Sequence, residues 1–248
     1  TNRLLAEGAP HTIRIKMPEN EIVAFDDMIR GRVSFETSLV DDKVLLKADG
    51  MPTYHLAVVV DDRAMEISHI FRGEEWLPSA PVHILLWDYL GWKEEMPNWA
   101  HLPLILKPDG NGKLSKRDGD RLGFPVYAMN WNDPKTGDLT TGFRERGFLP
   151  EAFVNMLALL GWNDGTEQEI FDMNELVQKF SVDRISKAGA KFDFEKAKWY
   201  NQEWIKRAPN AELLPEVKAV LEKHGLNTAD YTDIFIESIL DLVKERLT

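Results

Sequence analysis

The first fifty residues alternate between apolar and polar side chains over short stretches. In TIRIKM (12–17) every second residue is apolar, which is the period of a half-buried β-strand. IVAF and RVSF follow as two further short strands, and VLLKA (44–48) precedes the turn-forming residues DGMP. We therefore expect a small β-rich region at residues 1–51. The inward-facing residues predicted for its first strand are Ile13, Ile15 and Met17.

The next region combines strand and helix patterns. YHLAVVV (54–60) is apolar throughout and fits a helix or a strand, whereas ISHIFRG (67–73) favours a strand. LPLIL (102–106) is continuously apolar, which is typical of parallel strands buried on both faces. Between these strands, Ser79 is expected to cap a helix that Gly91 ends. The apolar face of that helix comprises Val82, Leu85, Leu86, Tyr89 and Leu90.

The second half of the chain is mostly helical by pattern. Helices are expected at 151–160, 194–206 and 212–224, and a last one begins near Thr232. The stretch 121–148 is rich in Gly, Asn and Asp and reads as an irregular surface excursion. The predicted apolar faces are, in order, Phe153, Met156, Leu157 and Leu160; Ala197, Tyr200 and Trp204; Leu213, Val217 and Leu221; and Phe235, Ile239 and Leu242.

Composition narrows the class of protein. The 248 residues are 44% hydrophobic, which is ordinary for a globular fold with a core. No apolar run reaches the ~18 residues of a membrane span, and the absence of Cys excludes disulfides and thiolate zinc sites. A net charge of −11 disfavours a broad nucleic-acid-binding surface but leaves room for a locally basic site. We expect a cytoplasmic protein, and the first residue Thr1 and the helical ending KERLT suggest a piece of a longer one.

A cationic loop follows the predicted LPLIL strand. Strand, helix and strand in this order predict an α/β layer with a right-handed crossover, and such layers bind ligands beyond the carboxyl ends of their strands. There, KPDGNGKLSKRDG places Lys113, Lys116 and Arg117 around Ser115, between glycines that allow the loop to close. Mobile lysine charges suit a polyphosphate. The alternative is a solvated surface turn, which would be favoured if the pentapeptide KLSKR stood alone.

The surrounding sequence favours the first interpretation. ADGMPTYHLAVVVDDRAMEISHIFRGEEWLPSAPVHILLWDYLGW (48–92) precedes HLPLILKPDGNGKLSKRDG, and GFLPEAFVNMLALLGW (147–162) and KFDFEKAKWYNQEWIK (191–206) follow it. Together these segments resemble the glutamyl-tRNA synthetase family of class I aminoacyl-tRNA synthetases, and KLSKR resembles that family's version of the KMSKS signature. The likeness covers nearly the whole chain and is weakest at 121–142, which looks like a subfamily insertion.

The resemblance implies a fold and a division of the chain. It implies an α/β and α protein: the second half of a Rossmann-like nucleotide-binding fold, preceded by a small β-rich insertion end and followed by a mostly helical stem-contact region. The expected parts are 1–51 (the end of the acceptor-binding insertion), 52–108 (the nucleotide-binding fold), 109–205 (the KLSKR loop and the stem-contact region) and 206–248 (the start of the anticodon-binding helices).

The resemblance also implies an activity, a glutamate–tRNA ligase. Glutamate would attack the α-phosphate of ATP, and the resulting acyl group would move to tRNA(Glu); ATP with Mg²⁺, L-glutamate and tRNA(Glu) are the implied ligands of a monomer. Lys113 and Lys116 would be catalytic, stabilising pyrophosphate by charge. The remaining implied contacts are Lys113, Ser115, Lys116 and Glu75 for ATP, Tyr54 and Arg72 for glutamate, and Trp76 and Arg117 near the ATP and tRNA end. No metal-ligating side chain is expected.

Each of these residues has an ordinary structural alternative. Tyr54 and Trp76 could be packing residues, and Arg72 could form a structural ion pair with Asp61 or Asp62. Those two adjacent carboxylates would point to opposite faces of a strand and are interpreted as structural. Val58 departs from the family, in which many members carry Asn there. The scattered histidines are interpreted as structural or supporting residues; they are His55, His69, His83 and His101.

One sequence feature bears on whether the substrate is glutamate or glutamine, and another bears on whether residues 1–248 contain the whole catalytic site. YHLA (54–57) favours glutamate, because the sister glutaminyl family usually reads closer to YDFA. The His-x-Gly-His segment of class I synthetases does not occur in 1–248. We therefore expect that residues 1–248 alone do not charge tRNA, and sustained charging by the purified chain would contradict this.

Other classes of function remain as alternatives. A paralogue could bind tRNA or nucleotide without charging tRNA, and an intact or degraded His-x-Gly-His segment upstream would separate these cases. The paralogue that glutamylates a modified tRNA base is disfavoured by the helices expected after residue 206. An unrelated phosphate-binding α/β protein would leave 48–92 unexplained.

Overall fold

The computed structural model describes residues 2–116 and 118–247. The chain divides into two compact units. The N-unit comprises the chain up to Leu104 together with Ile185–Ala188, and the C-unit comprises Ile105–Arg184 and the chain from Gly189 onward. The four-part division expected from the resemblance stays a prediction.

The N-unit contains a mixed four-stranded sheet in the order β3-β2-β6-β5. β2 and β3 form an antiparallel hairpin that closes at Asp27 and Gly31, and Gly31 adopts the positive φ of 76° that suits a tight turn. β6 lies parallel to β5 and, through Asp27 and Trp99, parallel to β2. The three parallel strands therefore end at the same edge of the sheet. The strand bounds are Ile22–Asp27 (β2), Gly31–Glu36 (β3), His69–Gly73 (β5) and Asn98–Leu102 (β6).

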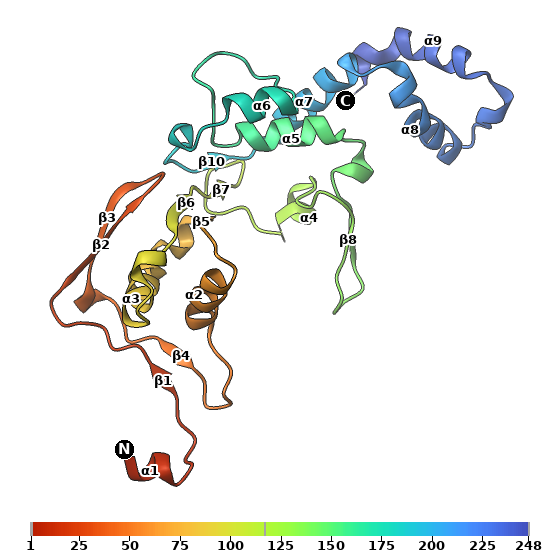
Figure 1. Cartoon of the computed structure of the whole chain (residues 1–248). Coiled ribbons are helices and arrows are strands. Elements are labelled where there is room, and N and C mark those ends of the chain that lie inside the picture. Colours follow the sequence, from red (N-terminus) through yellow and green to blue (C-terminus); the bar gives the residue numbers. More distant parts are fainter. Residues whose placement is uncertain (1, 117, 248) are drawn as a thin grey trace. The chain divides into compact units, whose positions relative to one another are not determined.

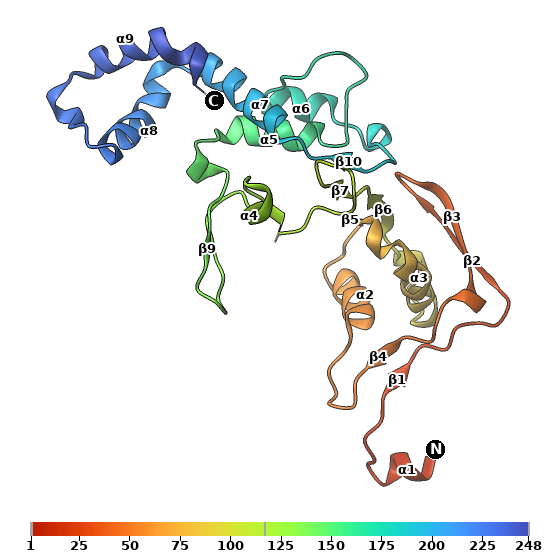
Figure 2. The same ribbon diagram turned by 180° about the vertical axis from the view of Figure 1, so that it is seen from behind.

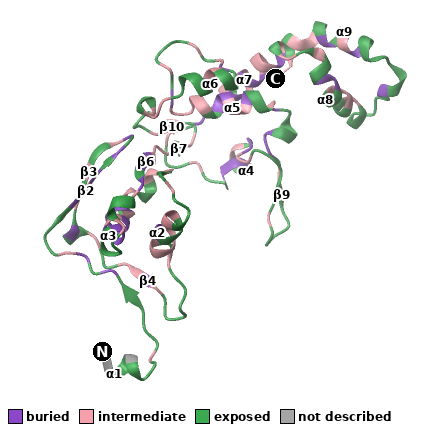
Figure 3. Ribbon diagram, in the orientation of Figure 1, coloured by how far each residue is buried: buried purple, intermediate pink, exposed green. Residues whose placement is uncertain are grey.

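Two helices, α2 (Tyr54–Ala64) and α3 (Ala80–Tyr89), accompany this sheet and contact each other (Figure 1). α3 joins the parallel strands β5 and β6, as the strand–helix–strand pattern predicted. It is buried on almost every side, so Figure 3 shows much of it in purple. Its Trp87 packs in one core with Phe25, Val59 and Trp99. The ambiguous YHLAVVV segment is thus a helix, packed through Val59.

The position predicted for the buried strand, LPLIL, was wrong. The buried strand is NWAHL, which is β6, and it ends at Leu102. Ile105–Leu106 forms the separate strand β7, which pairs in parallel with β10 (Ala190–Lys191) in the C-unit. Pro103 lies between them, and a proline has no N–H to donate to a neighbouring strand. Ile105 is correspondingly exposed rather than buried on two faces.

Two further N-unit predictions need correction. β1 (Ile13–Arg14) pairs with β4 (Val44–Leu46), but its register shifts between Ile13 and Arg14. This irregularity leaves Ile13 exposed, whereas Ile15 and Met17 are buried as predicted. Ser79 precedes α3, but a 3₁₀ turn (Glu74–Ser79) runs directly into the helix and the Ser79 side chain forms no capping hydrogen bond.

The C-unit is mainly helical, as predicted. The stretch 121–148 is more ordered than expected, because β8 and β9 form a two-stranded antiparallel hairpin within it (Figure 2, which labels β9). Asp172 and Glu175 form a reciprocal capping box at the start of α6. The described elements are α1 (Asn2–Ala6) in the N-unit and α4 (Asp118–Leu122), β8 (Trp131–Asn132), β9 (Leu139–Thr140), α5 (Pro150–Leu159), α6 (Met173–Lys179), α7 (Phe194–Arg207), α8 (Asn210–Lys223) and α9 (Asp233–Val243) in the C-unit.

The predicted buried face of the last helix was wrong. α9 begins after Thr232, whose hydroxyl accepts a hydrogen bond from the Phe235 amide. Its buried residues are Ile236 and Leu240, and Leu240 packs in one cluster with Ile205 and Leu213. The sequence DIFIESILDLV is apolar on more than one side, so its periodicity does not fix which side is covered. The exposed side includes the predicted residues Phe235, Ile239 and Leu242, and in α5 the predicted Leu157 is also exposed.

Buried amides tie α7 to the segments around α5. Asn155 is fully buried, and its Oδ1 accepts from the Phe171 amide and from Trp204 Nε1, each at 3.1 Å. Its Nδ2 donates to the Glu169 carbonyl at 2.9 Å. Asn201 likewise accepts from the Leu149 amide at 2.8 Å. These side chains satisfy backbone groups that would otherwise be buried without partners.

We predict that Asn155→Ala lowers the free energy of unfolding by about 2–4 kcal/mol, because three buried polar groups lose their partner. Urea unfolding followed by tryptophan fluorescence measures this change. The matched control is Asn174→Ala on the exposed side of α6, which we expect to change stability by less than about 0.5 kcal/mol. Equal effects of the two substitutions would contradict the role assigned to Asn155.

Candidate functional site

Arg72 is a partly buried cation near the carboxyl end of β5 in the N-unit. Its Nε donates to His101 Nε2 at 2.9 Å, and its Nη1 lies 3.0 Å from His83 Nδ1. The guanidinium carbon lies 4.9 Å from the centre of the Trp99 ring, within the range of a cation–π contact. Burial lowers the pKa of Arg72, and the nearby Tyr54 and Asp62 oppose this shift. An arginine remains charged under such conditions.

His101 connects Arg72 to a buried carboxylate. Because its Nε2 accepts from Arg72, the proton of the neutral ring lies on Nδ1, which donates to Asp27 Oδ2 at 2.6 Å. Asp27 also accepts from the amides of Ile29 and Arg30 at the end of β2. Burial is the largest influence on His101 and lowers its pKa, so the ring is neutral at pH 7.

His83 continues a second chain of hydrogen bonds on the other side of Arg72. Its Nδ1 accepts from the guanidinium, which leaves the proton on Nε2, 3.0 Å from His55 Nδ1. Burial, followed by the charge of Arg72, lowers the pKa of His83 to about 3. Burial likewise lowers the pKa of His55. The histidines predicted to be scattered supporting residues therefore gather around Arg72, except for His69, which bonds Ser68 instead.

One donor of Arg72 remains unused. Nη2 is buried and has no hydrogen-bond partner within residues 2–116 and 118–247. In the same described part of the chain, no ion pair joins Arg72 to Asp61 or Asp62, so the structural ion pair considered from sequence is absent there. The two carboxylates lie on helix α2 rather than on a strand. A partly buried guanidinium with a buried N–H that lacks a partner is suited to bind an anion.

Aromatic residues lie close to this cation. Tyr54 begins α2, and its ring centre lies 6.0 Å from that of His83. The Tyr54 and Trp76 rings are 4.4 Å apart at an angle of 39°, and 46% and 36% of these two residues are exposed. Glu75 folds back against Gly73: a Cβ at Gly73 would lie 2.0 Å from Glu75 Oε2. The structure thus brings Tyr54, Arg72 and Trp76 into one neighbourhood of the N-unit.

The KLSKR loop belongs to the C-unit. Lys113 forms a β-bridge with Leu106, and the Leu114 amide donates to the Ile105 carbonyl at 2.8 Å. The turn between them depends on Gly110 and Gly112, whose φ angles are 78° and 86°. The loop is therefore the returning arm of a tight turn that follows β7.

Within KLSKR, the residues that anchor the loop differ from those that are exposed. Leu114 packs against the core around Phe124 and Phe192. Ser115 donates to Asp118 Oδ2 through its amide at 2.9 Å and its hydroxyl at 2.6 Å. Lys113 and Lys116 are exposed. The predicted Arg117 lies outside the described residues.

Asp118 holds the loop together and was not anticipated from sequence. It accepts from Ser115 and Arg121, and Lys107 Nζ lies 3.5 Å from its Oδ1. These hydrogen bonds, led by the Ser115 hydroxyl, keep the pKa of Asp118 far below its usual value. No local sequence signal distinguishes Asp118 from the neighbouring Asp120. Asp118 holds the loop only because the turn brings Ser115 within hydrogen-bonding distance of its carboxylate.

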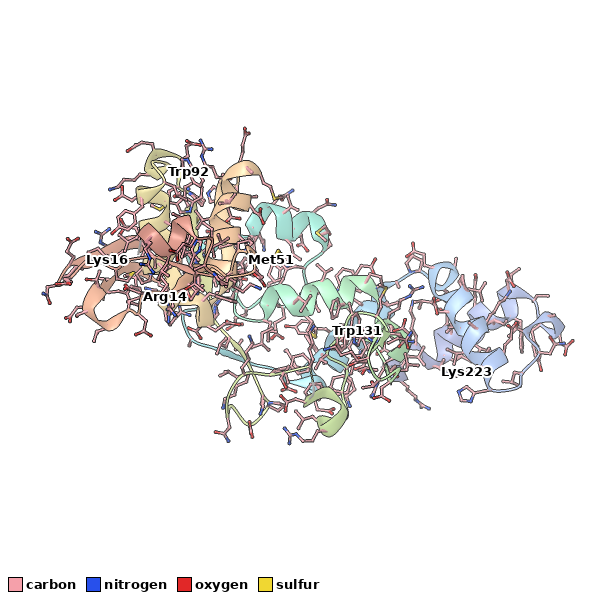
Figure 4. All side chains as sticks on the ribbon, turned by 90° about the horizontal axis from the view of Figure 1, so that it is seen from below. Arg14, Lys16, Met51, Trp92, Trp131 and Lys223 are labelled. Atoms are coloured by element: carbon pink, nitrogen blue, oxygen red, sulfur yellow. The ribbon has the colours of Figure 1, made fainter. Side chains whose placement is uncertain are left out.

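Lys116 lies beside the 121–142 hairpin. Its Nζ is 5.5 Å from the centre of the Tyr127 ring, and that ring stacks on Trp131 at 5.6 Å and 12°. Trp131 is labelled in Figure 4 and is 43% exposed. The segment interpreted as an insertion thus places two aromatic rings against a lysine of the loop.

Among the described residues, no group of three or more His, Cys, Asp or Glu side chains could hold a metal ion. None of the described helices is long and apolar enough to span a bilayer.

Comparison with known proteins places these features in a family. The family model described as "tRNA synthetases class I (E and Q), catalytic domain" matches residues 1–199. The chain belongs to this family. The N-unit sheet, with its parallel strands and the helices α2 and α3, agrees with the Rossmann-like α/β class of the synthetase catalytic domain.

Individual members of the synthetase family are similar over almost the whole chain. Proteins named glutamate–tRNA ligase from Porphyromonas gingivalis and Cytophaga hutchinsonii are each 54% identical over 246 residues, which is 99% of this chain and 48% and 47% of theirs. A crystal structure of a glutamate tRNA ligase from Elizabethkingia meningosepticum in complex with its amino acid superposes with a TM-score of 0.91 at 49% identity, over 99% of this chain and 48% of that one. The chain spans about half the length of the curated relatives it matches.

We predict that Asp118→Ala speeds hydrogen exchange of the Ser115 amide in this synthetase loop, because that amide loses its acceptor. The lowered pKa means that the carboxylate is ionised above pH ~4, so its contribution is present there and is lost only as the pH falls through the lowered value. Protection of Ser115 in the unsubstituted chain, corrected for intrinsic exchange, should therefore be constant from about pH 5 to 8.

Mass spectrometry of the peptide that contains Ser115 measures this exchange. The matched control is Asp138→Ala in the hairpin, where the side chain is exposed; it should leave Ser115 protected. Unchanged protection in Asp118→Ala would show that Asp118 does not hold the loop.

Proposed function

We propose that this protein acts as a glutamate–tRNA ligase, which activates glutamate with ATP and transfers it to tRNA(Glu). Membership of the synthetase family and the names of its relatives support this activity. The observation that supports a carboxylate-bearing substrate is Arg72, a partly buried cation whose buried Nη2 has no hydrogen-bond partner among the described residues. A buried donor without a partner is costly, and an anionic ligand removes that cost.

In this proposal Arg72 binds a carboxylate of glutamate. Planar guanidinium groups match carboxylates in geometry and charge. Tyr54 and Trp76 form the neighbouring wall, with their rings 4.4 Å apart. A glutaminyl enzyme is the alternative. It is disfavoured because the relatives are named glutamate–tRNA ligase and because the chain reads YHLA at 54–57, where the glutaminyl family usually reads closer to YDFA. Arg72 does not separate the two amino acids, since glutamine also carries an α-carboxylate.

Lys113 and Lys116 act on the phosphates. In the activation step a carboxylate oxygen of glutamate bonds to the α-phosphorus of ATP. The bond from that phosphorus to the bridging oxygen breaks, and pyrophosphate leaves with the bonding electrons. Charge therefore grows on the leaving group, which exposed lysine ammonium groups can follow and neutralise. Leu114 and Ser115 anchor the loop that carries both lysines.

The remaining predicted contacts involve Ser115, Glu75 and Arg117. Ser115 uses its amide and hydroxyl donors on Asp118, so an ATP contact through Ser115 requires exchange of a partner. Glu75 and Arg117 stay predicted contacts of ATP and tRNA. Mg²⁺ would arrive on the ATP phosphates, which is its usual mode of binding in nucleotide sites.

We predict that Lys116→Ala, made in the complete reading frame that contains this chain, reduces glutamate-dependent ATP–pyrophosphate exchange by ~10²–10³ while the KM for ATP changes little. The reason is that a preorganised charge acts mainly in the transition state. Initial rates at varied ATP separate the two effects. Lys135→Ala in the exposed hairpin turn is the matched control and should retain exchange.

Charging of tRNA with glutamate and with glutamine, measured in parallel on the same preparations, tests the proposed function. Attachment of glutamate that Lys116→Ala abolishes supports it. Attachment of glutamine alone, or tRNA binding without attachment of either amino acid, contradicts it. An equal loss of exchange rate and ATP affinity in Lys116→Ala would make the lysine a ground-state binder.

We also predict that Arg72→Lys raises the KM for glutamate about 10- to 100-fold. An ammonium group keeps the charge but cannot reproduce the planar fork that contacts two imidazoles and a ligand. Arg32→Lys is the control, since Arg32 forms an exposed ion pair with Asp26. A KM for glutamate unchanged in Arg72→Lys would remove Arg72 from the amino-acid site.

A further inference from the structure

The hydrogen bonds around Arg72 all run in one direction. Arg72 donates to His101, which donates to Asp27; Arg72 also donates to His83, which donates to His55. Neither direct partner of the guanidinium is a carboxylate. Asp27 is separated from it by the width of an imidazole ring and is already used by backbone amides and by His101.

We propose that His101 and His83 are positioning residues that act on the amino-acid substrate through Arg72. By accepting its Nε–H and Nη1–H, they aim the remaining Nη2–H at a substrate carboxylate. By remaining neutral, they leave the guanidinium charge to that carboxylate. This inference rests on the proposed function and deepens it, because it assigns the selection of an anionic substrate to buried residues that do not touch the substrate.

Neutral acceptors have a physical advantage over carboxylates at this place. A carboxylate bonded directly to Arg72 would form a closed ion pair, and a substrate anion would then compete with it. An imidazole offers one lone pair and no charge, so it fixes the orientation of the guanidinium without cancelling its attraction for the substrate. Asp27 contributes by fixing the tautomer of His101, in the way that second partners orient catalytic and metal-bound histidines.

The two histidines present different ring nitrogens to Arg72. Asn and Gln substitutions should therefore have opposite effects at the two positions. His101 uses Nε2 and His83 uses Nδ1. The Gln side-chain oxygen lies near the place of Nε2, and the Asn oxygen lies near the place of Nδ1. His101→Gln and His83→Asn therefore retain an acceptor for Arg72. His101→Asn and His83→Gln retain the contact on the far side, to Asp27 or to His55, and lose the acceptor for Arg72.

The experiment measures glutamate-dependent ATP–pyrophosphate exchange by the complete protein and its four variants. We expect His101→Asn and His83→Gln to raise the KM for glutamate about 10- to 100-fold. We expect His101→Gln and His83→Asn to raise it less than about 3-fold, and all four to keep the KM for ATP within about twofold. A purely structural role would not reverse the order of Asn and Gln between the two positions. Equal effects of Asn and Gln, or equal increases in both KM values, overturn the proposal.

A second measurement does not depend on activity or on the folding of variants. Nitrogen-15 NMR of the unsubstituted protein distinguishes the histidine tautomers. The network requires the proton on Nδ1 of His101 and on Nε2 of His83 at pH 7. Opposite tautomers, or charged rings, overturn the inference whatever the exchange assay shows. If the tautomers are as required but the complete protein shows no glutamate-dependent exchange, the proposed function is contradicted. The hydrogen-bond network around Arg72 would then bind an anion other than glutamate.

Discussion

The partly buried charge of Arg72 constrains the groups that surround it in the N-unit. N–H donors of a guanidinium that are withdrawn from water need hydrogen-bond acceptors, because leaving them without partners is costly. The sheet supplies those bonds through its register. Arg72 and His101 are direct partners on the parallel strands β5 and β6, so their side chains emerge side by side on one face. β2 joins the same edge through Asp27, which is thereby placed behind His101.

The lysines of the C-unit have a different part in the proposed reaction. In that proposal Arg72 holds a substrate carboxylate in a fixed orientation. The departing pyrophosphate changes position and charge, so a cation that neutralises it must be able to follow. The loop meets this requirement by fixing its backbone through Leu114, Ser115 and Asp118 while Lys113 and Lys116 remain exposed. Immobilising the backbone keeps both lysines close to the turn that follows β7.

Local pattern predicted those parts of the fold that short-range interactions control. The β2–β3 hairpin and the helices of the C-unit follow from periodicity, and Gly91 and Gly225 end their helices with positive φ. Pattern failed where long-range packing decides. Pro103 divides an apolar run between two sheets, and the covered side of α9 depends on Ile205 and Leu213 from other helices.

The candidate site divides in the same way. Tyr54, Arg72 and the lysines were predicted through the resemblance of long segments to one family. The hydrogen-bonding partners of Arg72 were not predicted, because Asp27 and His101 are separated by 74 positions along the chain. Nothing in the sequence distinguishes one of the four histidines from another. The parallel pairing of β5 and β6 and the placement of α2 and α3 bring three of them together near Arg72 and leave His69 apart.

The contact of Lys116 with Tyr127 is weak enough to be compatible with its proposed role. A cation–π contact at an exposed position contributes ~0.5–1 kcal/mol, which changes the population of one lysine rotamer only about two- to five-fold. The Nζ–ring distance of 5.5 Å lies toward the long end of such contacts. A phosphate anion offers a charge-assisted hydrogen bond that is worth more than this. Lys116 can therefore rest on the hairpin without a ligand and leave it at little cost when a phosphate group arrives.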